Sequence, residues 1–170
     1  SGHNLSTVIN DILDFSKIEA NQLAVNKSVF SLNQLINDIQ LWLEMKSAEK
    51  GLQLTILSLG HFSDYVYSDP IRIRQILSNI ISNAIKFTKS GSIFVTYGVK
   101  NGQLEFIVKD TGIGIPPEHF HLLFRPFSQV DSTIHKQFGG TGLGLVISKN
   151  LAQILGGDVQ LVESDLHQGS

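Results

Sequence analysis

The sequence contains no cysteine, so neither a disulfide bridge nor a thiolate nucleophile can form within its 170 residues. It also lacks a basic excess. The formal net charge is −2, which argues against binding to nucleic acid or to an anionic membrane through bulk charge. No hydrophobic run approaches the length of a bilayer span and no signal-peptide pattern opens the chain. We therefore expect a soluble, cytoplasmic chain without membrane contact of its own, which leaves open a membrane anchor in a longer parent protein.

Hydrophobic side chains make up 42% of the sequence, enough for one substantial core and one compact domain with an appendage. The appendage is the first stretch, where apolar residues recur at helical spacing: Leu5, Val8, Ile9, Ile12, Phe15 and Ile18. This pattern predicts an amphipathic helix. Such a helix either packs on the following domain or forms half of an interhelical seam from a longer protein, and we favour the seam.

The next elements follow from alternation and from capping residues. Residues 22–30 predict a short strand, residues 52–57 a second strand, and residues 60–68 a loop. Between the two strands, Ser31 and Gln34 have the spacing of a capping box, and Gly51 is expected to end the helix. Its apolar face comprises Leu32, Leu35, Ile36, Ile39, Trp42 and Leu43.

A further helix begins at Asp69 and Pro70, a capping carboxylate followed by a proline that fits the first turn. Its apolar face comprises Ile73, Ile76, Leu77, Ile80 and Ala84. Its polar stripe comprises Arg72, Gln75, Asn79, Asn83 and Lys86. Asparagine has poor helix propensity and gains little from an exposed site, so the stripe suggests a function. Asn83 offers a neutral oxygen suited to Mg²⁺, and Lys86 can reach a phosphate.

Two strands are predicted over residues 92–99 and 103–109, joined by the hairpin signal Asn101-Gly102. They lead to the sequence DTGIGI at residues 110–115. There Asp110 supplies a hydrogen-bond acceptor at a strand end, and the glycines allow the backbone to approach a flat ligand. A carboxylate in a pocket with apolar walls suits an exocyclic amine such as that of adenine. A tight loop without ligand is the alternative.

Residues 116–138 have no steady period, and we interpret them as a mobile lid anchored by Phe124 and Phe127. Two histidines in this segment, His119 and His121, fit surface positions better than a metal pair. The sequence GGTGLG at residues 139–144 precedes an apolar helix that ends at Gly156, and a final strand is expected over residues 158–163. Glycine-rich backbone before a helix N-terminus forms an anion site. The residues after the glycines fit neither a P-loop nor a dinucleotide fingerprint.

Four motifs occur in one order: NIISNAIKFT at residues 79–88, DTGIGI at 110–115, FRPF at 124–127 and GGTGLGL at 139–145. Together they resemble the sensor histidine kinases, in the ATP-binding superfamily that also contains DNA gyrase, Hsp90 and MutL. The resemblance covers nearly the whole chain. NDILDFSKIEA at residues 10–20 resembles the end of a second dimerisation helix, and FSQVD at 127–131 is common among hybrid members with receiver domains.

This resemblance implies a two-layer α/β sandwich, the Bergerat-type ATP-binding fold, with helices on one side of a mixed sheet and ATP between helices and lid. It assigns the adenine amine to Asp110, Mg²⁺ to Asn83, and the phosphates to the catalytic residues Asn79 and Lys86. Further nucleotide-binding positions are Gly112, Gly114, Ile115, Phe124, Gly140, Thr141, Gly142, Leu143 and Gly144. Lys136 is a candidate for the γ-phosphate, with a solvated lid residue as the alternative.

The resemblance also divides the chain. Residues 1–22 would be the C-terminal part of the second dimerisation helix, and residues 23–170 the catalytic ATP-binding domain without the family's last strand. None of the six histidines lies in an H-E-x-x-T-P-like box, so the acceptor histidine is expected on a helix absent from this chain. The implied partners are ATP, the protein's own dimerisation and phosphoacceptor domain, a receiver domain or response regulator, and a second copy in a full-length homodimer.

Position 79 separates kinase from ATPase chemistry. The gyrase-like ATPases place a water-activating glutamate four residues before the metal-binding asparagine, and Asn79 occupies that position here. An amide cannot accept a proton at neutral pH, which favours phosphoryl transfer to an external acceptor. A related ATPase and a degenerate module that signals without catalysis are the alternatives.

Overall fold

The computed structural model describes residues 2–112 and 143–161, with side chains from residue 9 onward. The elements follow one another as α1 (Gly2–Glu19), β1 (Ser28–Ser31), α2 (Leu32–Glu49), β2 (Gln53–Ser58), β3 (Tyr65–Ser68), α3 (Pro70–Lys86), β4 (Ser92–Lys100), β5 (Gln103–Asp110) and α5 (Gly144–Ile154). None of the helices in this part of the chain combines the length and the apolar character needed to cross a membrane.

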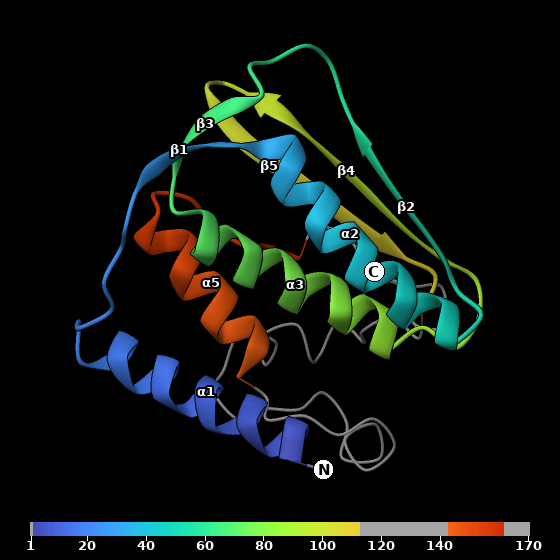
Figure 1. Cartoon of the computed structure of the whole chain (residues 1–170), viewed down its shortest axis with the longest axis horizontal. Coiled ribbons are helices and arrows are strands. Elements are labelled where there is room, and N and C mark those ends of the chain that lie inside the picture. The colour runs from blue at the N-terminus through green and yellow to red at the C-terminus, as the bar shows by residue number, and fades with distance from the viewer. Residues whose placement is uncertain (1, 113–142, 162–170) are drawn as a thin grey trace.

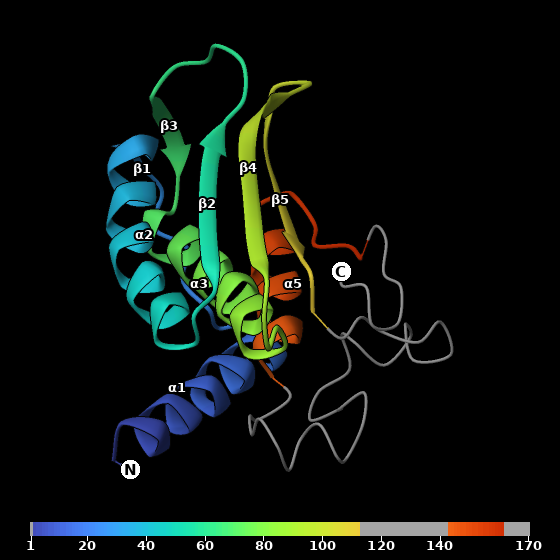
Figure 2. The same cartoon turned by 90° about the vertical axis from the view of Figure 1, so that its right-hand side faces the viewer.

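The main sheet has the order β2-β4-β5, with β2 parallel to β4 and β4 antiparallel to β5. A second, two-stranded sheet pairs β1 with β3. The helices α2, α3 and α5 cover one side of the main sheet, and α1 extends beneath them (Figure 1, Figure 2). A helical layer on a mixed sheet is the predicted two-layer α/β sandwich, which is confirmed.

The main core lies between these two layers. Side chains of β4 point alternately to the two faces of the sheet. Ile93, Val95 and Tyr97 are buried against the helices, whereas Phe94 is exposed on the other face. From the helical layer, α2 contributes Leu32, Ile39 and Leu43, and α3 contributes Leu77, Ile81 and Ile85. Each fully buried side chain of this size contributes about 1.5–3 kcal/mol relative to exposure, so this layer holds α3 in place beneath the sheet.

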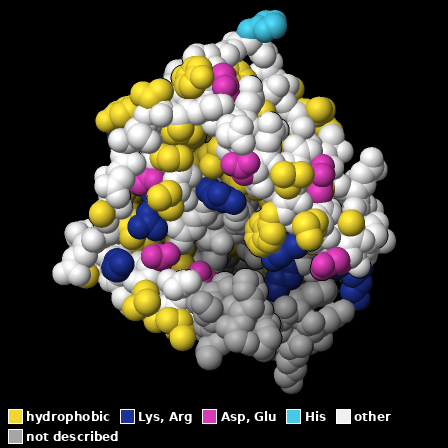
Figure 3. Space-filling model, in the orientation of Figure 1, with side chains coloured by type: hydrophobic (Ala, Val, Ile, Leu, Met, Phe, Trp, Pro, Cys, Tyr) yellow, Lys and Arg dark blue, Asp and Glu magenta, His cyan; other side chains and the backbone are white. Residues whose placement is uncertain are grey.

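A second core cluster joins α5 to α1 and α3. Leu143, Val146, Ile147 and Leu151 are buried, and Phe15, Ile18, Leu23 and Ile76 pack against them. The terminal helix therefore packs on the following domain through its last turns. Further toward its N-terminus, Ile9, Ile12 and Leu13 are exposed, which keeps a free apolar face as the seam hypothesis requires. Figure 3 shows the helical side of the molecule, where hydrophobic side chains are interspersed with charged ones.

Three sequence-based expectations about strands were wrong. The strand expected over residues 22–30 is confined to β1, and the loop expected over residues 60–68 contains β3. These two short strands pair with each other in the register Val29 with Tyr67. Each depends on a partner far away in sequence, which local alternation cannot reveal. Residues 158–161 form no strand, and the rest of the expected last strand lies outside the described residues.

Helix α2 begins as predicted but with an additional cap. Ser31 Oγ accepts a hydrogen bond from the Gln34 N–H at 3.2 Å, which is the forward half of the capping box. Ser31 Oγ also donates to Asp64 Oδ2 at 2.6 Å, and Asp64 Oδ1 accepts from the Asn33 N–H at 2.8 Å. These two bonds hold the pKa of Asp64 below its usual value. The start of α2 is therefore fixed from the segment before β3.

The predicted apolar face of α2 is wrong at one position. Trp42 is 41% exposed, and the ammonium of Lys46 lies 4.2 Å from the centre of its ring. A cation over the face of an exposed aromatic ring contributes about 0.5–1 kcal/mol. The remaining residues expected on this face, from Leu32 to Leu43, are buried.

Candidate nucleotide-binding site

Helix α3 carries most of the predicted site, and its start is fixed as expected. Asp69 is buried, and its Oδ1 accepts from the N–H groups of Ile71 at 3.1 Å and Arg72 at 3.2 Å. Its Oδ2 accepts from the Asn26 N–H at 2.9 Å, a contact that ties the preceding segment to the same helix end. Two free N–H groups at the helix start are thereby satisfied.

The polar stripe of α3 divides into two halves with different contacts. In the first half, Gln75 Nε2 donates to Asp14 Oδ2 of α1 at 2.7 Å, and Arg72 Nη1 donates to Gln75 Oε1 at 3.0 Å. Arg72 Nη1 also lies 3.9 Å from Asp14 Oδ1. This half of the stripe therefore binds the terminal helix.

The second half of the stripe faces the N-terminus of α5. Asn79 Nδ2 donates to the Gly144 carbonyl oxygen at 3.4 Å, a contact across 65 positions of sequence. Helix α5 has Leu143 at its N-cap position, and no side chain among the described residues caps the helix there. A helix N-terminus attracts anions, because N–H groups and the positive end of the helix dipole converge there. The structure thus brings Asn79 to the start of α5 at Gly144.

One turn later, Asn83 and Lys86 are both half-buried. The side-chain amide of Asn83 makes no hydrogen bond within the part of the chain that the structure describes, so its oxygen can serve a ligand. Burial lowers the pKa of Lys86 from its usual value, because a partly desolvated ammonium is less stable. An ammonium in this environment is a suitable partner for phosphate, whose charge offsets the desolvation.

The sequence DTG at the end of β5 packs against the C-terminal end of α3. Gly112 is buried, and a Cβ atom at this position would lie 2.5 Å from the Phe87 carbonyl oxygen and 2.9 Å from Thr88 Oγ1. Asp110 is half-buried, and its Oδ1 accepts from the Gly112 N–H at 2.9 Å. Position 112 therefore requires glycine because its backbone lies close to the backbone of Phe87. It places Asp110 beside the helix that carries Asn83 and Lys86.

Thr111 anchors the same turn to the start of β4. Its Oγ1 accepts from the Ser92 N–H at 3.1 Å, and its backbone N–H donates to the Ser92 carbonyl at 3.2 Å. Gly91 lies directly over this side chain, where any Cβ would collide with Thr111 Oγ1. The turn is thus held from both sides.

Two predicted nucleotide-binding residues lie at the start of α5. The side chain of Leu143 is fully buried in the second core cluster, so only its backbone is available to a ligand. At Gly144 an added Cβ would meet nothing within 4 Å, which leaves open space beside the helix start. The other predicted positions, Gly114, Ile115, Phe124, Lys136, Gly140, Thr141 and Gly142, lie outside the described residues, as does the expected lid.

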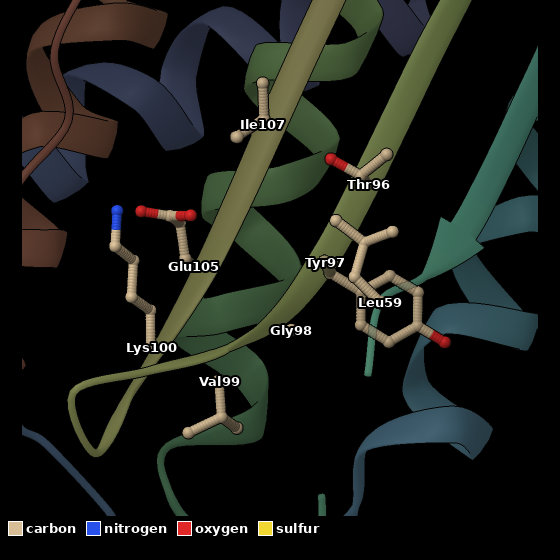
Figure 4. Close-up of a pocket in the computed structure, with 8 residues that line it drawn as sticks. All are labelled: Leu59, Thr96, Tyr97, Gly98, Val99, Lys100, Glu105 and Ile107. Carbon is tan, nitrogen blue, oxygen red and sulfur yellow. The ribbon is translucent and has the colours of Figure 1, made fainter. Parts of the chain in front are cut away.

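A cavity of about 220 Å³ lies elsewhere, on the side of the sheet opposite the helices (Figure 4). Its lining includes Leu59, Thr96, Gly98, Glu105 and Ile107. Apart from Leu59, which follows β2, these residues belong to β4 and β5, whereas Asp110 pairs with Ile93 at the end of these strands far from their connecting turn. The cavity is therefore separate from the candidate site.

Sequence reasoning missed the residues that hold the site together. Thr88 is fully buried and its Oγ1 donates to the Ala84 carbonyl at 2.7 Å. Lys50 donates from Nζ to the carbonyl oxygens of Ile85 at 2.7 Å and Lys86 at 3.1 Å. The importance of Thr88 could have been predicted from its position as the last residue of the sequence NIISNAIKFT. For Lys50 no local pattern exists, because its partners lie 35 and 36 positions away.

Comparison with known proteins places this geometry in a family. Residues 68–170 match the family described as "Histidine kinase-, DNA gyrase B-, and HSP90-like ATPase". The signal transduction histidine-protein kinase BarA of Escherichia coli (strain K12) is 40% identical over 175 residues, covering 100% of this chain and 19% of BarA. The circadian input-output histidine kinase CikA of Synechococcus elongatus is 43% identical over 172 residues, covering 100% of this chain and 23% of CikA.

Solved structures agree with these relatives. Full-length ShkA in complex with AMPPNP superposes with a TM-score of 0.86 at 30% identity, covering 99% of this chain and 35% of ShkA. The catalytic domain of the histidine kinase ThkA gives a TM-score of 0.64 at 28% identity, with 76% of this chain and 82% of that domain covered. The chain spans about a fifth of the length of the curated relatives it matches. It belongs to the histidine kinase-, DNA gyrase B- and HSP90-like ATPase family, as an ATP-binding catalytic domain of the histidine kinase type.

Proposed function

We propose that the chain binds Mg-ATP between α3, the DTG turn and the N-terminus of α5. The proposal is carried by one observation: Gly112 seats the Asp110 turn on the end of α3 that also presents Asn83 and Lys86. In this arrangement Asp110 accepts a hydrogen bond from the adenine amine, and Asn79 and Lys86 orient the phosphates. The glycine-rich backbone before α5 supplies N–H groups to the phosphates.

Mg²⁺ would be held by the side-chain oxygen of Asn83 together with phosphate oxygens. A hard cation that already carries phosphate charge needs few protein ligands, and a neutral amide oxygen is one of its usual partners. Bound there, the metal neutralises charge on the phosphates during transfer. Asn83 fits this task because it is half-buried near Lys86 on the same face of α3.

The reaction we propose is transfer of the γ-phosphoryl group to a histidine on a dimerisation helix that this chain does not contain. Residues 1–22 then belong to the second dimerisation helix and residues 23–170 to the catalytic domain. The exposed face of Ile9, Ile12 and Leu13 on α1 fits a helical partner in a homodimer of the parent protein. A receiver domain or response regulator accepts the phosphoryl group afterwards. The carboxylate needed to activate water is replaced by Asn79.

Labelled ATP tests this proposal. Incubated alone, the chain is expected to bind ATP with Mg²⁺ but to acquire no acid-labile phosphate. When the parent protein's dimerisation domain is added, acid-labile phosphate should appear on that domain, and D110N should abolish it. Steady phosphate release without an acceptor would indicate an ATPase. Failure to bind ATP at all would indicate a module that signals without catalysis.

A further inference from the structure

The C-terminal end of α3 is completed by a lysine from another helix. Every helix leaves its last four carbonyl oxygens without a partner inside the helix. In α3 these belong to residues 83–86. The Asn83 oxygen accepts from the Phe87 N–H at 3.0 Å, the Ala84 oxygen from Thr88 Oγ1 at 2.7 Å, and the Ile85 oxygen from the Thr88 N–H at 3.3 Å.

Lys50 completes this set. Its Nζ donates to the Ile85 oxygen at 2.7 Å and to the Lys86 oxygen at 3.1 Å. Hydrogen bonds from an ammonium are stronger than those from neutral donors, and a cation at a helix C-terminus also interacts favourably with the helix dipole. Lys50 therefore contacts the last turn of α3, which presents Lys86 to the phosphates and receives Gly112 at Phe87.

The backbone of Lys50 is fixed as well, because it forms the C-cap of α2. The Gly51 N–H donates to the Ala48 carbonyl at 3.0 Å and the Leu52 N–H to the Ser47 carbonyl at 2.9 Å. This pair of bonds is a Schellman motif, which closes the helix with glycine in the left-handed region. The backbone of Lys50 thus caps α2, while its ammonium contacts the C-terminal carbonyl oxygens of α3. Burial lowers its pKa, and the carbonyl oxygens around it compensate for part of the lost hydration.

We propose that Lys50 is a positioning residue of the nucleotide site, which acts through the last turn of α3 to hold Lys86 in place for the phosphates of ATP. The inference rests on the proposed function, because it requires Lys86 to contact phosphate. It places Lys50 outside contact with the nucleotide itself.

Binding of ATP and of adenosine, each with Mg²⁺, tests the role. The net contribution of one ordinary hydrogen bond corresponds to about a fivefold to tenfold change in an equilibrium constant. We expect K50M to weaken ATP binding by about that factor while adenosine binding changes less than about twofold, since adenosine has no phosphates. K50R should keep ATP affinity near that of the unaltered chain, because it retains the donors. K46M is the matched control, since Lys46 is exposed on the same helix and lies over Trp42.

A double-mutant cycle separates positioning from direct attraction between Lys50 and the phosphates. If Lys50 acts through Lys86, adding K50M to K86M causes no further loss of ATP affinity. An equal loss for ATP and adenosine in K50M, or the same loss persisting in the K86M background, would overturn the proposal. Circular dichroism establishes that each variant is folded, and K50Q replaces K50M if the latter is not. If the unaltered chain binds no ATP, or D110N changes nothing, the nucleotide site itself is refuted instead.

Discussion

Replacing Gly112 with alanine tests the contact on which the site is built. The new Cβ would lie 2.5 Å from the Phe87 carbonyl oxygen and 2.9 Å from both Asp110 Oδ1 and Thr88 Oγ1, where ordinary contact begins at 3.4 Å. The helix end cannot move away easily, because Thr88 is fully buried and bonded to Ala84. The Asp110 turn must therefore shift.

The magnitude follows from these neighbours. Overpacking of this kind costs about 1–3 kcal/mol, and about 2–4 °C of melting temperature is lost per kcal/mol in a domain of this size. We expect G112A to melt roughly 2–12 °C lower. Displacement of Asp110 should also weaken ATP binding about tenfold or more, since small errors in position are costly at a binding site.

The assay combines thermal unfolding with ATP titration. Gly157 provides the matched control, because its added Cβ meets only the Ala152 carbonyl oxygen, at 3.6 Å, and G157A should change neither quantity measurably. If G112A unfolds at the same temperature and binds ATP as the unaltered chain does, the close packing of the DTG turn on α3 is refuted.

Two further predictions concern the contacts that hold α1 and the start of α2. Replacing Asp14 with alanine removes the acceptor for Gln75 at 2.7 Å, so D14A should lower the free energy of unfolding by about 1 kcal/mol and speed hydrogen exchange in α1. K17A, at an exposed position of the same helix, should change neither quantity. Unchanged exchange in α1 of D14A would show that this contact does not hold the helix. Hydrogen bonds from Ser31 and Asn33 lower the pKa of Asp64 in the folded chain. The stability that its carboxylate contributes is therefore present above the usual pKa of 3.8 and is lost as the pH falls through the lower pKa of the folded state. D64N should be less stable than the unaltered chain at neutral pH and should lose less stability on acidification. Denaturant unfolding at both pH values measures this, and identical acid profiles for D64N and the unaltered chain would contradict it.

The elements that sequence predicted correctly are those with local causes. Asp69 and Pro70 start α3 and Ser31 starts α2, because each cap acts within three residues of its own position. The hairpin between β4 and β5 was found from Asn101-Gly102 for the same reason. Motif order, in turn, predicted the family.

What sequence could not predict depends on partners distant in the chain. Strand β3, for example, pairs with β1, which precedes α2 in the chain. The polar stripe on α3 also depends on distant partners, because its first half contacts α1 and its second half contacts the start of α5. Arg72 and Gln75 share the periodicity of Asn79 and Asn83, yet they bind Asp14 of α1, 61 positions before Gln75. Periodicity shows which residues share a helix face but not what covers each part of it.

The most direct test of the account is titration of the chain with ATP, with and without Mg²⁺, compared with D110N and N83A. We predict that D110N loses the preference for ATP over GTP, because an amide is no longer a pure acceptor for the adenine amine. N83A should retain binding without metal but lose the gain that Mg²⁺ provides. Unchanged ATP affinity and purine preference in D110N would contradict the account.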